Sequence, residues 1–294
     1  MADAVFRTPE ERFESLPAFD YEPKYWEWDG LRLAYIDVGE GPPILLQHGE
    51  PTWSFLWRKV IPPLVAAGFR CIAPDLPGFG RSDKPTDLAW YSYDRHAAQL
   101  RQLVEQLDLD GATFVVHDWG GPIGLRVATE SPERVSRVVA MDTGVFTGSF
   151  KMSDNWQQFH DFVINTPDLP VGFLIKGGCA KDMQDDVFAA YEAPFPTPAS
   201  KAGPRSFPPM IPRSEDHPDA VTGRHVLEQL ARADWPKLVL WADRDPVLPA
   251  RLGEALAARI GAPSPTWIEG GGHFLQEDCG AQIGEIIAEW LAQR

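Results

Sequence analysis

Short apolar runs alternate with segments of helical spacing along most of the chain. The runs that are almost continuously apolar, as expected of strands buried on both faces of a sheet, lie at 43–47, 70–73, 112–116, 135–141, 237–242 and 265–269. Helical spacing is found between and after them, at 55–67, 93–107, 122–129, 250–260 and 281–292. The alternation predicts an α/β fold with a mostly parallel central sheet and helices on both faces. An antiparallel hairpin is predicted before it, because 24–28 and 31–37 flank the turn sequence Asp29-Gly30.

The alternation stops after residue 143 and resumes at 233. The intervening segment, 144–232, contains helical fragments and a proline-rich stretch at 194–218 that excludes a long regular element. We expect it to be a mainly helical cap inserted after the sixth strand, between two parts of the core at 1–143 and 233–294. Such a cap covers the carboxyl ends of the strands, where open α/β sheets bind ligands.

Charge and composition narrow the class of protein. The formal net charge of −15 at pH 7 argues against nucleic acid or an anionic membrane as a partner, because it repels phosphate. No apolar run approaches the roughly 20 residues needed to span a bilayer, and the N-terminal residues lack the apolar core of a signal peptide. Cys71, Cys179 and Cys279 are scattered and read as free thiols, which favours a cytoplasmic location.

One corner of the chain carries the chemistry. In His117-Asp118-Trp119-Gly120-Gly121 a buried strand turns directly into a helix, and α/β-hydrolases hold their nucleophile at a corner of this kind, usually as Ser. A carboxylate there suits attack on saturated carbon through an alkyl ester on the enzyme. The alternative is that Asp118 only caps the following helix. A base and an acid later in the chain would favour the interpretation of Asp118 as the nucleophile.

The base is expected to be His273, on the glycine-rich loop 270–274 after a strand. The other later histidines with room for an acid before them, His217 and His225, fall in the predicted cap. Asp245 is the favoured acid because Pro246 fixes the turn behind it, with Asp142 and Asp243 as alternatives. The order nucleophile, acid, His is that of the α/β-hydrolase fold.

Backbone N–H groups are expected to complete the site. The residue after the nucleophile, Trp119, supplies one oxyanion donor in this fold. The other comes from a loop after an early strand, where Glu50 follows His48-Gly49 and Pro51 has no N–H to donate. The sequence has no metal-ligand spacing, and the chemistry requires no metal or organic cofactor.

The segments His48-Gly49-Glu50-Pro51-Thr52-Trp53, His117-Asp118-Trp119-Gly120-Gly121, Tyr191-Glu192-Ala193-Pro194-Phe195-Pro196 and Gly272-His273-Phe274 resemble haloalkane dehalogenases over nearly the whole chain. The subfamily is the one with Glu after His-Gly. The resemblance implies Asp118 as nucleophile, His273 as base, Asp245 as acid and Trp119 as halide ligand. The indole N–H of Trp119 suits that last role because it is a donor without an acceptor.

The second halide donor is the open point. The subfamily takes it from a Trp early in the cap, and an ungapped alignment places Phe159 in that position, so Trp156 one turn earlier is the tentative donor. The alternative is that Trp156 only packs the cap. Phe159, Phe162 and Val247 are the expected lining of an apolar substrate pocket. The expected ligands are a small halogenated substrate and the halide product, and the expected assembly is a monomer or a weak homo-oligomer.

Three alternative functions remain. Epoxide hydrolases share the Asp nucleophile but normally use two cap tyrosines, and this cap has only Tyr191. Enzymes acting on other halogenated substrates, such as fluoroacetate, usually have Arg after the nucleophile, where Trp119 stands here. A non-catalytic ligand-binding protein of the same fold would tolerate loss of nucleophile, base or oxyanion loop, and all three are present.

Overall fold

An eight-stranded sheet forms the centre of the molecule. The computed structural model describes residues 2, 4–149 and 154–293, and its main sheet has the order β10-β9-β8-β7-β4-β5-β3-β2. Strand β3 is antiparallel to β2 and β5, and the other neighbours are parallel. The strands are β2 (Lys24–Trp28), β3 (Leu31–Val38), β4 (Pro43–Gln47), β5 (Arg70–Pro74), β7 (Ala112–Asp118), β8 (Val135–Thr143), β9 (Lys237–Ala242) and β10 (Thr266–Ile268).

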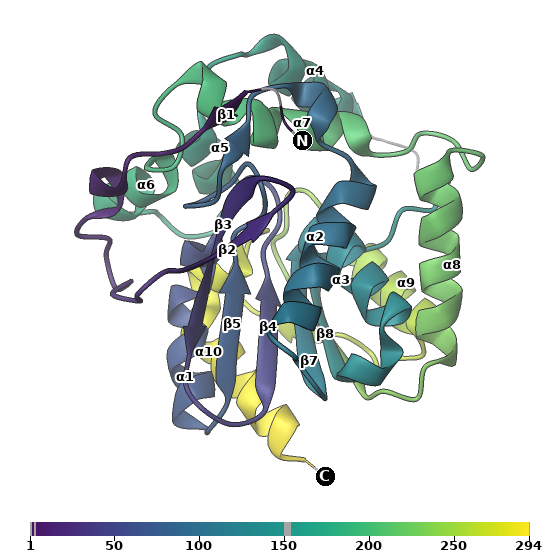
Figure 1. The fold of residues 1–294 in the computed structure, drawn as a ribbon. Helices are drawn as coiled ribbons and strands as arrows, with labels where there is room; N and C mark the ends of the chain where they lie inside the picture. Colours follow the sequence, from purple (N-terminus) through teal and green to yellow (C-terminus); the bar gives the residue numbers. More distant parts are fainter. Residues whose placement is uncertain (1, 3, 150–153, 294) are drawn as a thin grey trace.

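Helices cover both faces of this sheet, which explains why the inner strands are continuously apolar. Helices α1 and α10 contact each other on one face, and the other carries a layer in which α2 contacts α3, α3 contacts α8 and α8 contacts α9. Figure 1 shows α2 and α3 in front of the sheet and α10 behind it. These helices are α1 (Ile61–Ala66), α2 (Tyr93–Gln106), α3 (Gly120–Glu130), α8 (Pro218–Arg232), α9 (Arg251–Ile260) and α10 (Leu275–Ala292).

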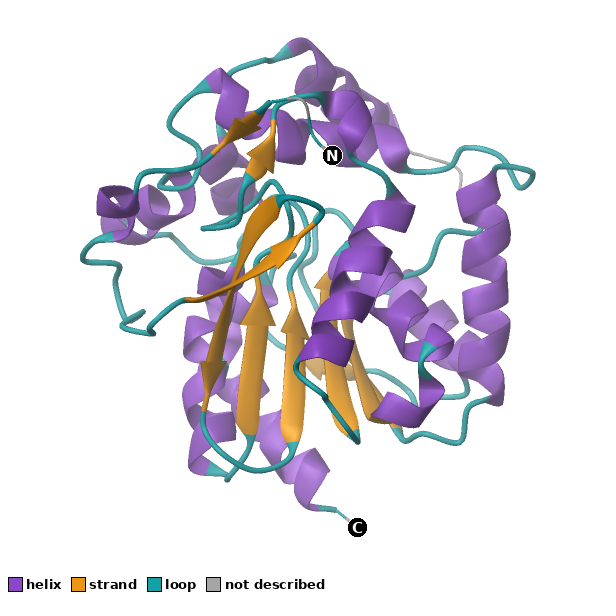
Figure 2. Ribbon diagram, viewed as in Figure 1, coloured by secondary structure: helices purple, strands orange, loops and turns teal. Residues whose placement is uncertain are grey.

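A group of shorter helices lies over the carboxyl ends of the strands, at the top of Figures 1 and 2. They are α4 (Asp154–Asn165), α5 (Val171–Gly178), α6 (Asp185–Glu192), the 3-10 helix η5 (Pro198–Lys201) and α7 (Ala202–Met210). This insertion follows β8, the sixth strand of the main sheet. Residues 150–153 of the predicted cap lie outside the described residues. Among the residues that are described, no helix is long and apolar enough to cross a membrane.

Helix α8 departs from the sequence-based division into core and cap. The sequence analysis placed residues 218–232 in the cap, but α8 packs against α3 and α9 in the layer beside the sheet. Its buried residues Ala220, Gly223, Val226, Leu227 and Leu230 form one stripe along the helix, as expected of a helix packed on one side. The structure therefore places this helix with the core.

One other expectation was wrong in detail, and proline accounts for the difference. The helix predicted at 55–67 is a 3-10 helix, η2 (Ser54–Lys59), followed by α1, which has Pro62 in its first turn. Proline is favoured in the first turn of a helix and disfavoured in its interior, so a new helix begins there instead of η2 continuing. The proline-rich stretch does contain a nine-residue helix, α7. A short strand pair that the patterns did not predict, β1 (Val5–Phe6) with β6 (Lys84–Pro85), forms a second sheet.

Candidate active site

Asp118 ends β7 in a strained conformation. Its φ is +49°, in the left-handed region that side chains rarely adopt, and its carbonyl accepts a hydrogen bond from Oγ1 of Thr143. The turn closes only because glycines follow: a Cβ on Gly120 would lie 2.3 Å from the carbonyl oxygen of Gln47, and one on Gly121 would lie 1.7 Å from Oγ1 of Thr143. The N-cap of α3 is Trp119, and no side chain caps it. Asp118 is therefore not the cap of this helix.

The two oxygens of the Asp118 carboxylate have different neighbours. The backbone N–H of Glu50 donates to Oδ1 at 2.7 Å, and Nε2 of His273 lies 3.4 Å from Oδ2. A Cβ on Gly49 would lie 2.2 Å from Oδ1 and 2.6 Å from the backbone N of Trp119, so this oxygen and that backbone N both lie beside Gly49. The side chain of Asp118 keeps 18% of its surface exposed. One oxygen is thus held by the backbone and the other faces the histidine.

His273 is oriented by Asp245. Its Nδ1 donates to Oδ2 of Asp245 at 2.8 Å, and both side chains are buried. The other oxygen of Asp245 accepts the N–H groups of Val247 at 2.6 Å and Leu248 at 2.8 Å, so the turn after β9 fixes the carboxylate. The carbonyl of His273 accepts a hydrogen bond from Nε2 of the buried His117 at 2.8 Å.

The two alternative acids have other partners. Asp142, at the end of β8, accepts the N–H of Ala242 on Oδ1 at 3.0 Å, and its Oδ2 has no hydrogen-bond partner among the described residues. Asp243 accepts the N–H of Gly270 at 2.8 Å and holds the turn before the base. Of the three candidates, the structure brings only Asp245 into a hydrogen bond with His273.

The titratable groups of the site are of two kinds: some have a partner of opposite charge within hydrogen-bond reach, and others do not. Burial opposes a charge on His273, but Asp245 and Asp118 outweigh it and raise the pKa of His273 well above its ordinary value. Burial would also raise the pKa of Asp245, but the charge and hydrogen bond of His273 lower it. Asp142 and Glu50 lack such a partner, so burial, reinforced by the charges of Asp245 and Asp118 respectively, raises the pKa of each well above its usual range. Burial therefore disfavours a negative charge on Asp142 and on Glu50.

The indole of Trp119 lies between two phenylalanine rings. Its ring centroid is 4.6 Å from that of Phe146, which follows β8, and 4.8 Å from that of Phe207 on α7, both edge to face. Within the described part of the chain, its indole N–H has no acceptor among the hydrogen bonds of the protein. The sequence analysis missed both phenylalanines. Phe207 was hidden in the proline-rich stretch, where no helical pattern was predicted.

The tentative halide and pocket residues differ in their surroundings. Trp156 on α4 packs against the ring of His160 at 5.1 Å and beneath the guanidinium of Arg213 at 5.3 Å. Phe159 is partly buried and packs against the hydrophobic core. The side chains of Phe162 and Val247 are 44% and 50% exposed, so the structure does not enclose them with the nucleophile in a dry pocket.

A buried ion pair that the sequence patterns did not reveal joins the cap to the core behind His273. Arg58 on η2 binds both oxygens of Glu277 in the first turn of α10, each at 2.6 Å. The hydroxyl of Tyr191 on α6 donates to the same carboxylate at 2.9 Å, and Lys59 donates at 2.7 Å. Burial would raise the pKa of Glu277, but the hydrogen bonds of Arg58 and Lys59 lower it. The one signal that could have pointed to Glu277 as part of this region is its closeness to His273 in the sequence.

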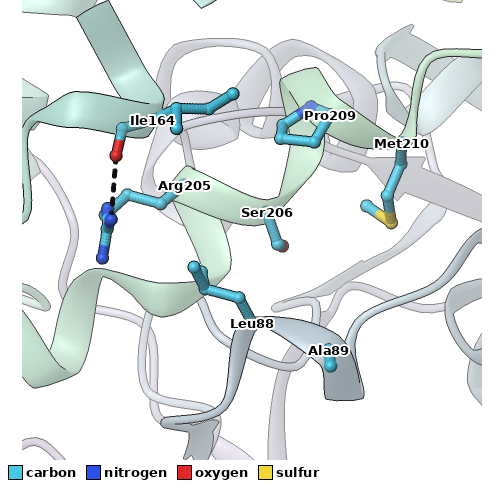
Figure 3. A pocket seen from close by; sticks show the side chains of 7 residues that line it. All are labelled: Leu88, Ala89, Ile164, Arg205, Ser206, Pro209 and Met210. Atoms are coloured by element: carbon cyan, nitrogen blue, oxygen red, sulfur yellow. Dashed lines mark hydrogen bonds between the residues drawn. The ribbon is translucent and has the colours of Figure 1, made fainter. Parts of the chain in front are cut away.

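A surface groove of about 360 Å³ borders α7 on the outside of the cap. Figure 3 shows its lining, which comes from the 3-10 helix η3 (Leu88–Trp90), from Ile164 of α4 and from α7, where Arg205 donates to the carbonyl of Ile164 at 3.1 Å. None of the described residues that line it belongs to the Asp118–His273–Asp245 set. Helix α7 therefore contributes both to this groove and, through Phe207, to the packing of Trp119.

The acidic cluster at the base has a spacing that could hold a metal ion, since one ligand atom each of Asp142, Asp245 and His273 lie within 4.8 Å of one another. However, Nδ1 of His273 is already bonded to Asp245, and both oxygens of Asp245 are used in hydrogen bonds. His273 and Asp245 thus form a hydrogen-bonded pair in which the other ring nitrogen, Nε2, faces Asp118.

Comparison with known proteins identifies the family. The model of the α/β-hydrolase fold family matches residues 42–170. The haloalkane dehalogenase of Psychrobacter cryohalolentis is 39% identical to this chain, over 98% of this chain and 98% of its own length. That of Mycobacterium marinum is 40% identical, over 97% of this chain and 99% of its own length. The solved structure of a tetrameric haloalkane dehalogenase from Paraglaciecola agarilytica NO2 superposes with a TM-score of 0.90 at 37% identity, covering 96% of this chain and 97% of that one. The chain belongs to the haloalkane dehalogenase family and has the α/β-hydrolase fold.

Proposed function

We propose that this protein hydrolyses haloalkanes to an alcohol and a halide through an alkyl ester on Asp118. The observation that carries the proposal is the placement of the Asp118 carboxylate, with Glu50 N–H on one oxygen and His273 facing the other. In a Ser hydrolase the histidine activates the nucleophile, but a carboxylate needs no activation. The histidine is thereby left for the second step.

In the first step, Oδ2 of Asp118 attacks the carbon that bears the halogen. The C–O bond forms as the carbon–halogen bond breaks, and the halide leaves with the bonding electron pair. The indole N–H of Trp119 is the donor for that charge. Phe146 and Phe207 exclude water around the indole, which strengthens a hydrogen bond to a developing anion. Trp156 is the weaker candidate for a second donor, because its ring packs against His160 and Arg213.

In the second step, His273 takes a proton from water, and the oxygen of that water attacks Cγ of the Asp118 ester. The N–H groups of Glu50 and Trp119 stabilise the resulting oxyanion. As it collapses, the Cγ–O bond to the alkyl group breaks, the leaving oxygen takes the proton from His273 to give the alcohol, and the new carboxyl group releases its proton to solvent. Ester formation removes the negative charge that raises the pKa of His273 together with Asp245. Alkylation therefore makes the histidine a ready proton acceptor at the moment it is needed.

Halide release from a panel of short bromo- and chloroalkanes tests the proposal, with Asp118→Ala as the control. We expect release by the wild-type protein and none above background by the variant. Binding of the same compounds without turnover would instead support the non-catalytic alternative.

Epoxide hydrolysis is the second candidate, because it shares the aspartate nucleophile. It needs acids that donate to the opening epoxide oxygen. The hydroxyl of Tyr191 is fully buried and donates to Glu277, so it is not free for that role. Diol formation from an epoxide without halide release from 1-bromobutane would reverse the order of the two candidates.

Three expectations about partners and location stay predictions. A small apolar halogenated substrate follows from the proposed reaction, and no metal or organic cofactor takes part in it. A monomer or weak homo-oligomer is expected, although the Paraglaciecola relative is a tetramer, and sedimentation of the purified protein would distinguish the two. A cytoplasmic location is the third.

A further inference from the structure

One carboxylate joins the loop of His273 to the segment that follows α5. Asp278, in the first turn of α10, accepts the N–H of Gly272 and the N–H of Ala180 on Oδ2, both at 2.8 Å. Its Oδ1 accepts the N–H of Lys181 at 2.9 Å, and Nζ of Lys181 donates to the carbonyl of Asp278 at 2.6 Å. One side chain thus binds the residue before the base and two residues of the cap.

The two segments also meet directly, backbone against backbone. The N–H of His273 donates to the carbonyl of Gly178 at 2.7 Å. A Cβ on Gly272 would lie 2.4 Å from that carbonyl oxygen, and a Cβ on Gly178 would lie 2.5 Å from the ring of Phe274. No side chain fits between the loop and the cap here, so the position of one segment fixes the position of the other.

The Asp278 carboxylate does not have the ordinary role of an acid in the first turn of a helix. Such an acid stabilises the free N–H groups and the dipole of its own helix. The three N–H groups bound by Asp278 belong instead to residues 180, 181 and 272, outside α10. The N–H groups of residues 272 and 273 are consecutive: the first is bound by Asp278 of α10 and the second by the carbonyl of Gly178 in the cap.

We propose that Asp278 is a positioning residue for the base, which keeps His273 in reach of the Asp118 ester by holding its loop against cap residues 178–181. The proposal rests on the function proposed above, because it assigns the two chemical steps to different residues. Alkylation uses Asp118 and Trp119, whereas hydrolysis of the ester needs His273. Loosening the loop therefore slows the second step and leaves the first unchanged.

The test variant is Asp278→Asn. An amide has one acceptor oxygen and a donor group in place of the second, so it cannot accept all three N–H groups. Glu285→Gln is the matched control, because Glu285 also lies on α10, is exposed and loses the same charge. Rapid-quench measurement of bromide from 1-bromobutane gives the alkylation rate, and mass spectrometry of the intact protein follows the butyl ester.

We expect Asp278→Asn to release the first equivalent of bromide at the wild-type rate, then to turn over about 10- to 100-fold more slowly while the ester accumulates. Glu285→Gln should match the wild type in both phases. A variant that loses both phases together, or that never accumulates ester, would overturn the proposal. If the Asn variant does not fold, Asp278→Glu gives the same test, since it keeps the charge but moves the carboxylate.

His273→Gln separates failure of this proposal from failure of the function. It must accumulate the ester if Asp118 is the nucleophile and His273 the base. Ester in His273→Gln but not in Asp278→Asn contradicts the positioning role alone. Absence of ester from both contradicts the two-step reaction itself.

Discussion

Glu50 donates its backbone N–H to Oδ1 of Asp118 at 2.7 Å and buries its own carboxyl group beside that carboxylate. In the part of the chain that the structure describes, Oε1 of Glu50 has no hydrogen-bond partner, and burial together with the charge of Asp118 raises the pKa of Glu50 well above 4.5. The raised pKa disfavours a second negative charge beside the Asp118 carboxylate. One residue thus donates a backbone N–H to Asp118 and limits the charge next to it.

Replacing Glu50 by Gln should therefore alter the pH dependence of stability more than activity. The backbone donor remains, so the loss in kcat should stay well below the roughly 10²-fold cost of removing an oxyanion donor. In the wild type, the folded state keeps a proton that the unfolded state loses above about pH 4.5. Stability from this group is present below that pH and is lost as the pH rises toward the folded pKa. The difference in Tm between the variant and the wild type should therefore grow as the pH rises above about 4.5. A difference that stays constant with pH would contradict a raised pKa of Glu50.

The two acids near His273 should respond differently to substitution by Asn. Asp245→Asn removes the charged acceptor of Nδ1–H and should lower the rate of ester hydrolysis roughly 10⁴-fold, as loss of a triad carboxylate does elsewhere. Burial disfavours a charge on Asp142, so Asp142→Asn should remove little charge and cost less than about tenfold. Single-turnover kinetics of the two variants measures the loss in the rate of ester hydrolysis for each. A larger loss for Asp142→Asn would make Asp142 the acid.

Halide binding should depend on Trp119 far more than on Trp156. Trp119→Phe removes the N–H that has no protein acceptor within the described residues, and loss of a hydrogen bond to an anion should weaken bromide binding about 10- to 100-fold. Trp156→Phe should leave the bromide affinity unchanged, because its ring packs against His160 and Arg213. Product inhibition by bromide measures the bromide affinity of each variant. Equal losses would mean that Trp156 is a halide ligand.

The buried pair of Arg58 and Glu277 should be a large contributor to stability. Removing one partner of a buried ion pair leaves an uncompensated charge and typically costs about 3–5 kcal/mol, so Arg58→Met should lower the free energy of unfolding by about that amount. Arg259→Met is the control, since Arg259 is exposed on α9. Urea unfolding of both variants measures the difference. Similar small losses in the two would show that the pair contributes little.

The sheet could be predicted from the sequence because its strands are buried on both faces and bounded by turns. Strands β4 and β9 begin and end where the apolar runs do. The corner at Asp118 and the loop at His273 were also recognisable, because glycines mark the close backbone contacts. The surroundings of Trp119 were not. Phe207 reaches the indole through the tertiary placement of a helix within a proline-rich stretch, and no periodicity reports such a contact. Helix α8 was misplaced for a similar reason, since its pattern shows an apolar face but not which layer covers it.

The central claim is that Asp118 carries the alkyl group. A single turnover of 1-bromobutane by excess enzyme in water labelled with heavy oxygen tests it most directly, followed by mass spectrometry of the butanol and of the peptide that contains Asp118. If water attacks Cγ of the ester, the label enters the Asp118 carboxylate and the first butanol is unlabelled. Labelled butanol with an unlabelled Asp118 would contradict the account, because it would mean that water attacks the haloalkane directly.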